Sequence, residues 1–444
     1  MNRREFLKGT VATAGVAAAG CATAAQQCAN GVCSLAGGAK SAPLIASAPM
    51  LQNPAPTSMG VAFAVSAMAN GFVEYSESAD MTGAVKVKCG GFRVTDMNDK
   101  VMLVRLTGLK PATRYHYRIG ADRISYEGGY KMKILGTEID PKVYSFTTAG
   151  EGAKSHFCVC NDTHAQWDSF GLVADKIAEI GPSVAVWNGD ACNTQETIES
   201  VVDIFLNPKI RRRDYAANIP FCLVPGNHDQ RGLACRHLER VFMFRQPEER
   251  LSRDWDLGRN FAFRLGDVAM VGLDTGEDKP DGRDVFAGLF NNEPYRVAQT
   301  AWLADALERP EIKSAPYIVA FCHIPLFDSD PRMNPGGVCG NGDGKYLHDF
   351  AIWEKSCAEM WGPLFKRHGV QLLIVAHQHE YRCDAPTADR PWTQIVGGSP
   401  TLDEKHGRFS TVIEGKVDDG ELKVVVHDVH HRRIAGSFSF KPRS

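Results

Sequence analysis

Histidines, carboxylates and one asparagine follow five short apolar runs in the sequence, and side chains of these types bind metal ions. They stand in Asp162-Thr163-His164, Gly189-Asp190, Gly226-Asn227-His228-Asp229, His323 and His377-Gln378-His379. Imidazole and carboxylate ligands without a thiolate suit Zn, Mn, Fe or Co in a reactive site better than a structural zinc site. The chemistry that these residue types predict is metal-assisted hydrolysis.

The spacing within the clusters would allow two ions to be held. Two residues separated by one position in an extended loop point to the same side, so Asp162 and His164 can reach one ion, and His377 and His379 can do the same. Asp190 follows a glycine, which lets its carboxylate approach closely and bridge two ions. Two ions about 3.5–4 Å apart clamp the attacking and leaving oxygens of a phosphoryl displacement.

The apolar runs before the clusters are predicted to be buried strands of an α/β fold. Helical periodicity lies between them, and continuous apolar runs suit strands that are covered on both faces. Because sites in open α/β sheets form beyond the carboxyl ends of the strands, we expect the five clusters to converge. The runs are residues 157–160, 184–187, 221–224, 317–322 and 372–376.

The order Asp-x-His, Gly-Asp, Gly-Asn-His-Asp, His and His-x-His resembles that of the calcineurin-like metallophosphoesterase superfamily. The resemblance implies an α/β fold for residues 155–440, a four-layer αββα sandwich of two mixed sheets flanked by helices. It also implies hydrolysis of small phosphate mono- or diesters by a hydroxide that bridges two metal ions (Mn, Zn, Fe or Co).

By position, the resemblance implies a ligand set for each ion: Asp162, His164 and His379 for the first, Asn227, His323 and His377 for the second, and Asp190 as the bridge. His228 would not be a ligand and would act as the general acid that protonates the leaving oxygen. Asn227 would also stabilise charge on the transferring oxygens. Asp229 or Asn193 could orient His228, or either could be a turn residue.

Two departures from the family pattern concern the metal site. Ala376 stands where the family usually has Gly before the last motif, a small change that we expect to be tolerated. Purple acid phosphatases carry a Tyr three residues after the bridging Asp, where this sequence has Asn193, and they lack a His at the position of His164. A ferric ion with a tyrosinate ligand is therefore not expected.

Residues 58–149 are predicted to form a small all-β sandwich. Short alternating runs separated by turns lie at 61–65, 71–76, 84–88 and 115–119. Segments 106–118 and 144–148 resemble the end of a fibronectin type III-like domain, a layout similar to that of purple acid phosphatases. Residues 25–57, rich in Ala, Gly, Ser and Pro, are predicted to be a flexible tether.

The N-terminus resembles an export signal. Arg3-Arg4-Glu5-Phe6-Leu7-Lys8 and the apolar stretch 10–20 match the twin-arginine pattern, which predicts a signal peptide at residues 1–24. Ala22-Thr23-Ala24 fits a cleavage site, whereas Ala18-Ala19-Gly20-Cys21 resembles a lipoprotein box in which Cys21 would be acylated. The protein is expected to be periplasmic, or anchored to a membrane and facing the periplasm or cell surface.

Charge and cysteine content narrow the functions further. A net charge of −2 gives no electrostatic footprint for nucleic acid, and nothing in the sequence sets the oligomeric state. The 13 cysteines include no CxxC pair and leave disulfide connectivity open. Cys158 and Cys160 are expected to point to opposite faces of one strand and hence not to be bonded to each other.

Two other functions are weighed against phosphate ester hydrolysis. An exported redox metalloprotein would suit the export signal and the cysteines, but the sequence has no contiguous Cys cluster for an iron–sulfur centre. A non-catalytic surface binding protein could retain the same scaffold, although the full ligand set argues against it. Segments 231–300 and 327–361 are expected to form the wall that selects the substrate.

Overall fold

The computed structural model describes residues 42–89, 97–246, 255–327 and 344–443. The chain divides into two compact units, Met1–Ala42 and Pro43–Ser444, and almost all of the first lies outside the described residues. The predictions for the signal peptide, for Cys21 and for much of the tether therefore fall outside the described residues. Among those residues, none of the helices has the length and apolar character that a membrane span requires.

The larger of the two central sheets has nine strands in the order β20-β19-β18-β9-β10-β11-β1-β2-β5. Its centre is formed by β9, β10 and β11, which are parallel, fully buried and cover the first three predicted runs. The strands are β1 (Met50–Gln52), β2 (Ser58–Ala64), β5 (Val101–Thr107), β9 (His156–Cys160), β10 (Val184–Asn188), β11 (Phe221–Val224), β18 (Thr411–Asp418), β19 (Glu421–Asp428) and β20 (Arg433–Phe440).

The second central sheet has six strands in the order β12-β13-β14-β15-β17-β16. Its four inner strands are parallel, and an antiparallel strand closes each edge, so this sheet is mixed as well. The other two predicted runs form β14 and β15. The strands are β12 (Phe261–Leu265), β13 (Val268–Leu273), β14 (Tyr317–Cys322), β15 (Leu372–Val375), β16 (Arg382–Asp384) and β17 (Thr393–Val396).

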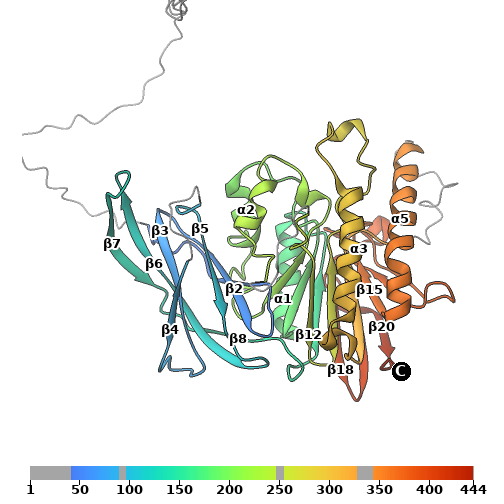
Figure 1. The fold of residues 1–444 in the computed structure, drawn as a ribbon, viewed down its shortest axis with the longest axis horizontal. Helices are drawn as coiled ribbons and strands as arrows, with labels where there is room; N and C mark the ends of the chain where they lie inside the picture. Colours follow the sequence, from blue (N-terminus) through green and yellow to red (C-terminus); the bar gives the residue numbers. More distant parts are fainter. Residues whose placement is uncertain (1–41, 90–96, 247–254, 328–343, 444) are drawn as a thin grey trace, which may run out of the picture. The chain divides into compact units, whose positions relative to one another are not determined.

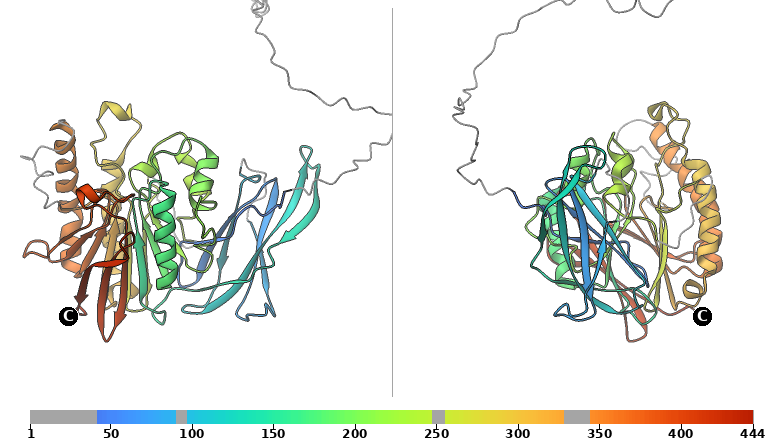
Figure 2. Two further views of the ribbon diagram at one scale, coloured as in Figure 1. Left: turned by 180° about the vertical axis from the view of Figure 1, so that it is seen from behind. Right: turned by 60° about the vertical axis from the view of Figure 1, so that its left-hand side comes forward.

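The two sheets pack face to face between two helical layers (Figures 1 and 2). One apolar cluster joins the sheets, a second joins the nine-stranded sheet to α1 and α2, and a third joins the six-stranded sheet to α3, α4 and α5. This arrangement confirms the predicted α/β sandwich of two mixed sheets. The helices are α1 (Trp167–Ile180), α2 (Ile198–Phe205), α3 (Asn292–Glu308), α4 (Pro310–Lys313) and α5 (Gly344–His368), with 3₁₀ turns η1 (His228–Gln230), η2 (Cys235–Arg240), η3 (Asp284–Phe286) and η4 (Glu404–His406).

Helix α1 illustrates why these segments fold as they do. Its buried residues Phe170, Val173, Ala174 and Ile177 recur at the three- and four-residue spacing of one helix face. The helix ends at Gly181, whose φ of 62° is left-handed and suits a residue without a side chain. The spacing therefore fixes which face of α1 covers the nine-stranded sheet.

The N-terminal strands form a further sheet that packs on the end of the nine-stranded one. It has the order β4-β3-β6-β7, with β8 paired to β6, and a shared apolar core joins it to β2 and β5. The predicted sandwich thus shares one of its sheets with the rest of the fold, since β1 pairs in parallel with β11. The strands are β3 (Ala69–Ser76), β4 (Val85–Lys88), β6 (Arg114–Tyr126), β7 (Met132–Ile139) and β8 (Tyr144–Thr147).

Two expectations from the sequence are wrong. The described part of the predicted tether, residues 42–57, is ordered: Met50 and Leu51 are buried in β1, which pairs with β2 and β11. Cys158 and Cys160 lie on the same face of β9, toward α1, because residues two positions apart in a strand share a face. Both of these cysteines are nevertheless free, like the other described ones.

Candidate metal centre

The five sequence clusters meet where strands of both central sheets end. Asp162, Asp190 and Asn227 follow β9, β10 and β11 of the nine-stranded sheet, whereas His323 and His377 follow β14 and β15 of the six-stranded sheet. Main-chain hydrogen bonds join the loops, from Asp162 N to Gly189 O (3.0 Å) and from Ala376 N to His323 O (2.8 Å). The edges of both sheets therefore hold the candidate ligands together.

The backbone at these strand ends is unusual. Five of the candidate ligands, Asp162, His164, Asp190, His377 and His379, have positive φ values between 44° and 72°. Left-handed conformations of such residues are costly and cluster at functional sites. These unusual conformations therefore coincide with the loops that carry the candidate ligands.

Two glycines leave the space that the centre needs. A Cβ on Gly189 would lie 2.3 Å from His323 Nδ1, and a Cβ on Gly226 would lie 2.2 Å from Asp190 Oδ1. Both distances are far below contact distance, and Gly189 also has a φ of +83°. Any side chain at either position would push Asp190 or His323 out of place.

The first ligand group contains Asp162, His164, Asp190 and His379, whose candidate ligand atoms all lie within 4.8 Å of one another. His164 Nε2 is 3.0 Å from His379 Nε2 and 3.5 Å from Asp190 Oδ2. His379 Nε2 is 3.5 Å from Asp162 Oδ1. These are the four residues that the resemblance assigned to the first ion and the bridge.

The second group contains Asp190, His323 and His377, again within 4.8 Å of one another. His323 Nε2 is 3.2 Å from Asp190 Oδ2, and His377 Nδ1 is 3.1 Å from Asn227 Oδ1. Asp190 thus belongs to both groups. All seven candidate ligands are brought together, and the two groups share the carboxylate that the sequence pattern placed between them.

Three of the atoms that face the centre lack a hydrogen-bond partner, as metal ligands would. Asp162 Oδ1, Asp190 Oδ2 and His323 Nε2 are buried polar atoms without a hydrogen bond among the described residues. Such groups are costly unless something satisfies them. The Nδ1 atoms of His164 and His323 each contact an oxygen, Asn193 Oδ1 at 2.8 Å and Asn188 O at 2.9 Å, so that Nε2 of each ring faces the other candidate ligands. The residues therefore fit a metal centre.

The electrostatics of the cluster also favour a cation. Burial raises the pKa of both central carboxyls, but the neighbouring histidines outweigh it, so the pKa of Asp162 lies well below its usual range and that of Asp190 falls to about 2. Burial lowers the pKa of His323, but Asp190 and Asp162 outweigh it and raise that pKa to about 10. Two buried, ionised carboxylates thus attract positive charge to the point where the groups meet.

His228 lies beside the two groups and is not a member of either. Its Nδ1 is 2.9 Å from the carbonyl oxygen of Asn193, its Nε2 is 3.9 Å from Asp190 Oδ2, and its backbone N–H donates to Asp190 Oδ1 at 2.9 Å. Burial lowers the pKa of His228 to about 4. Asn193 therefore orients both His228, through its carbonyl, and His164, through its side chain.

Asp229, the other residue considered as an orienting group, has a different role. Its carboxylate accepts hydrogen bonds from the backbone N–H groups of Ala191 (3.0 Å) and Gly226 (2.9 Å). It therefore ties the loop after β10 to the loop after β11. This contact sets the position of Asn227 and His228 through the main chain.

Sequence reasoning missed two residues beside the centre. Asp278 Oδ2 is a buried oxygen 3.3 Å from His377 Nε2, and Arg231 Nη1 is 3.0 Å from His228 Nε2. Asp278 follows β13, so the rule that polar clusters after buried strands form sites applied to it as well. The signal was weaker because four residues separate Asp278 from the end of the strand.

The chain is similar in sequence or in fold to several known proteins. Human acid phosphatase type 7 is 23% identical over 285 residues, 63% of this chain and 55% of that protein, and the mouse protein is 21% identical over the same length. The chain thus spans about half the length of these curated relatives. A purple acid phosphatase from yellow lupin seeds has a similar fold, with a TM-score of 0.61 and 13% identity over 90% of this chain and 75% of that one.

A second solved structure, of PhoD, has a TM-score of 0.58 and 12% identity. The match covers 90% of this chain and 94% of the PhoD chain. Residues 155–381 match the calcineurin-like phosphoesterase family, and this span contains every candidate ligand from Asp162 to His379. With its family match, its two-sheet sandwich and its clustered Asp and His side chains, the chain belongs to the calcineurin-like phosphoesterase family.

Proposed function

We propose that this protein is an exported phosphoesterase that hydrolyses phosphate mono- or diesters at a centre for two metal ions. The observation that carries the proposal is the pair of ligand groups that share Asp190. One carboxylate common to two groups is the arrangement that places two ions side by side. Bound there, two ions would lower the pKa of a water molecule and stabilise charge on the attacking and leaving oxygens.

In this proposal Asp162, His164 and His379 hold one ion, and Asn227, His323 and His377 hold the other. Their imidazole, carboxylate and amide donors suit Mn, Zn, Fe or Co. Asn193 in place of a tyrosine supports a centre without a ferric tyrosinate. The protein contributes rigid ligand positions, because each ligand follows a buried strand and several have a second hydrogen bond that fixes the side chain.

His228 is proposed to protonate the leaving oxygen. The carbonyl of Asn193 accepts from Nδ1, so Nε2 is the nitrogen that can carry a proton to substrate. The low pKa of His228 means that the ring alone holds this proton only in acid. A bound phosphate group is anionic and favours the charged ring, so substrate binding itself would promote the active protonation state.

The test is turnover of p-nitrophenyl phosphate and bis-p-nitrophenyl phosphate by protein loaded in turn with Mn, Zn, Fe or Co, together with the metal content per chain. We expect metal-dependent turnover, two ions per chain, and loss of both activity and one or more ions in Asp190→Asn. The preferred ester would assign a mono- or diesterase. Two bound ions without turnover of any ester would instead favour a binding protein on this scaffold.

Export is proposed from the N-terminal sequence alone. Arg3 and Arg4 before an apolar stretch support twin-arginine transport, and Cys21 supports a lipid anchor facing the periplasm or cell surface. Replacing both arginines by lysine should retain the protein in the cytoplasm, as measured by fractionation. Replacing Cys21 by alanine should release an exported protein from the membrane fraction if the cysteine is acylated, and leave its distribution unchanged if the chain is cleaved after Ala24.

A further inference from the structure

The position of the general acid indicates on which side of the centre the leaving group lies. An acid must be within hydrogen-bond reach of the oxygen that it protonates, so the leaving group must extend past His228. Arg231 is the neighbour of His228 Nε2, the nitrogen that would carry the proton. Its Nη1 is 3.0 Å from His228 Nε2, and its Nε is 3.1 Å from Glu277 Oε1. The region beyond Arg231 is therefore where the alcohol part of a substrate would lie.

An open cavity of about 750 Å³ lies in that region, and Arg231 forms part of its wall. Its volume is within the range of small-molecule sites and far exceeds what a phosphate group alone needs. The cavity is built from the residues after His228, the segment before β12 and the loop before α3. All of these belong to segment 231–300 or adjoin it, the part of the sequence predicted to select the substrate.

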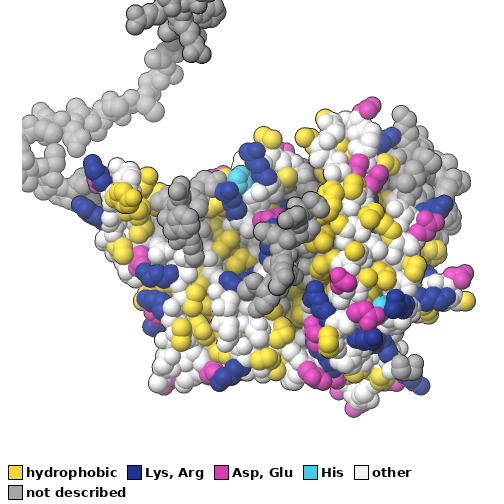
Figure 3. Space-filling model, in the orientation of Figure 1, with side chains coloured by type: hydrophobic (Ala, Val, Ile, Leu, Met, Phe, Trp, Pro, Cys, Tyr) yellow, Lys and Arg dark blue, Asp and Glu magenta, His cyan; other side chains and the backbone are white. Residues whose placement is uncertain are grey.

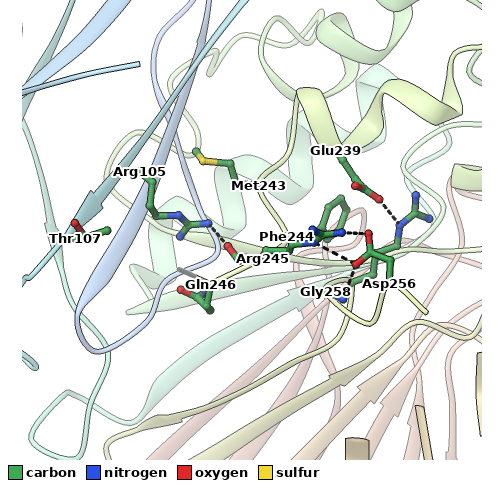
Figure 4. A pocket seen from close by; sticks show the side chains of 10 residues that line it. Arg105, Thr107, Glu239, Met243, Phe244, Arg245, Gln246, Asp256 and Gly258 are labelled. Carbon is green, nitrogen blue, oxygen red and sulfur yellow. Dashed lines mark hydrogen bonds and ion pairs between the residues drawn. The ribbon is translucent and has the colours of Figure 1, made fainter. Parts of the chain in front are cut away.

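The charged groups in this cavity largely neutralise one another. Arg259 pairs with Glu239 at 3.2 Å and lies 3.9 Å from Asp274, and Arg231 pairs with Glu277. Glu239 and Asp256 also line a neighbouring cavity, in which Asp256 pairs with Arg245 (Figure 4). Paired charges give little attraction to a highly charged ligand, so recognition must come from the remaining surface.

The rest of the lining is mixed: Gln230, Arg236, Asn291 and Asn292 are polar, and the other large side chains are aromatic or aliphatic. Phe286 and Phe290 form one pair with ring centroids 4.3 Å apart, and Trp255 and Tyr295 form a second pair at 6.4 Å. Leu289, at the rim, is 87% exposed. The space-filling view shows hydrophobic side chains gathered over α3 and the loop before it (Figure 3). Two aromatic pairs around one cavity suit a flat aromatic ring, because rings gain from offset or edge-to-face contacts beyond their apolar area.

We propose that this cavity binds the leaving group of the substrate, and that the leaving group carries an aromatic ring. The proposal rests on the phosphoesterase function proposed above and names the substrate class of that site. A phosphate ester held by ions bound in the two groups that share Asp190 would direct its ester oxygen to His228 and its ring past Arg231, between the two aromatic pairs. The reaction is ordinary hydrolysis: water adds to phosphorus, the P–O bond to the alcohol breaks, and the alcohol oxygen receives the proton from His228. The proton released by the attacking water then restores the charged form of His228.

The test compares 2-phenylethyl phosphate with ethyl phosphate, two primary alkyl esters that differ in the ring and hardly in the acidity of the leaving alcohol. We expect kcat/KM to be about tenfold or more higher for the ring-bearing ester, as partial burial of a phenyl group predicts. Phe290→Ala should reduce this ratio about threefold or more, because Phe290 is half-buried in the loop and its removal opens one aromatic pair. Tyr130→Ala removes an aromatic ring that is fully exposed and outside the cavity, and should leave the ratio unchanged.

Three outcomes would overturn the proposal. A ratio near one for the unaltered protein would remove the aromatic preference while leaving the phosphoesterase intact. Equal losses on both esters in Phe290→Ala, or an equal effect of Tyr130→Ala, would show a structural and not a recognition effect. If neither ester is turned over, the cavity is tested alone by binding of 2-phenylethanol. Binding is measured as quenching of the Trp255 fluorescence, with Trp255→Phe as the reference. Absence of saturable binding would overturn the proposal.

Discussion

The buried carboxylate of Asp278 gives a sharp test of how the second ligand group is held. Asp278 Oδ2 lies 3.3 Å from His377 Nε2, while His377 Nδ1 lies 3.1 Å from Asn227 Oδ1. A neutral imidazole has one N–H, so it can donate to only one of these two oxygens. If Nε2–H donates to Asp278, Nδ1 is left as a lone pair beside Asn227 Oδ1, and both atoms are then positioned to bind one cation. Asp278 would in this way fix the tautomer of His377.

The expected magnitude follows from this role. Asp278→Asn keeps the shape of the side chain and removes the charge that selects Nε2–H. Losing such an outer hydrogen-bond partner lowers metal affinity about 10- to 100-fold, or about 1.4–2.8 kcal/mol. The first ligand group does not include His377, so the affinity of its ion should change much less. The variant should therefore hold one ion firmly and the other weakly.

The assay is the metal content per chain at equilibrium with buffered free metal, for the unaltered protein and for Asp278→Asn. Asp428→Asn is the matched control, because Asp428 is also buried and also contacts a histidine, at 2.6 Å from His431 Nδ1, but belongs to neither ligand group. Unchanged affinities for both ions in Asp278→Asn would refute the reasoning. So would an equal loss in the Asp428→Asn control.

Four further predictions concern the centre and the fold around it. Gly226→Ala should abolish binding of at least one ion in the same metal assay, since its Cβ would stand 2.2 Å from Asp190 Oδ1. His228→Asn should keep both ions but lower kcat about 10²- to 10⁴-fold on alkyl esters, and less on p-nitrophenyl phosphate, whose leaving group needs no proton. Glu414→Gln should lower the unfolding free energy by about 1–2 kcal/mol at pH 7, because hydrogen bonds from His156 and His427 hold the pKa of Glu414 at about 2. That contribution is present above the ordinary pKa of 4.5 and is lost as the pH falls toward 2, so urea titrations of the two proteins should converge there. Chelation should lower the melting temperature, and adding metal at 1,000 times its Kd should restore about 4 kcal/mol, as calorimetry would measure.

The sequence predicted the buried central strands, because a continuous apolar run is a strong signal for a strand that is covered on both faces. The runs that became β9, β10, β11, β14 and β15 are apolar at every position because both faces of these strands are covered. Strand β13 has the same continuous apolar pattern and was not among the predicted runs. Polar residues directly after such strands can only lie at the sheet edge. For that reason the five clusters could be named from the sequence, and the resemblance to the calcineurin-like family separated the seven candidate ligands from His228. The structure brings these seven side chains together.

The features that escaped prediction depend on tertiary contacts. Strand β1 is three residues long and lies in a stretch rich in Ala, Ser and Pro, so its order comes from pairing with β2 and β11 and not from its own composition. The roles of Asn193 and Asp229 were left open because both are common turn residues. Only the spatial neighbours show that Asn193 contacts two histidines and that Asp229 joins two loops.

Each ligand group contains residues from both central sheets. In the first group Asp162 follows β9 and His379 follows β15, and in the second Asp190 follows β10 and His323 follows β14. The geometry of the centre therefore depends on how the two sheets pack, which the apolar cluster between them determines. Well-packed interiors deform little, so a stiff core holds the ligands in place without a flexible loop having to close. The same dependence means that a cavity in this core should weaken metal binding even though no ligand is touched, through a shift of one sheet edge against the other.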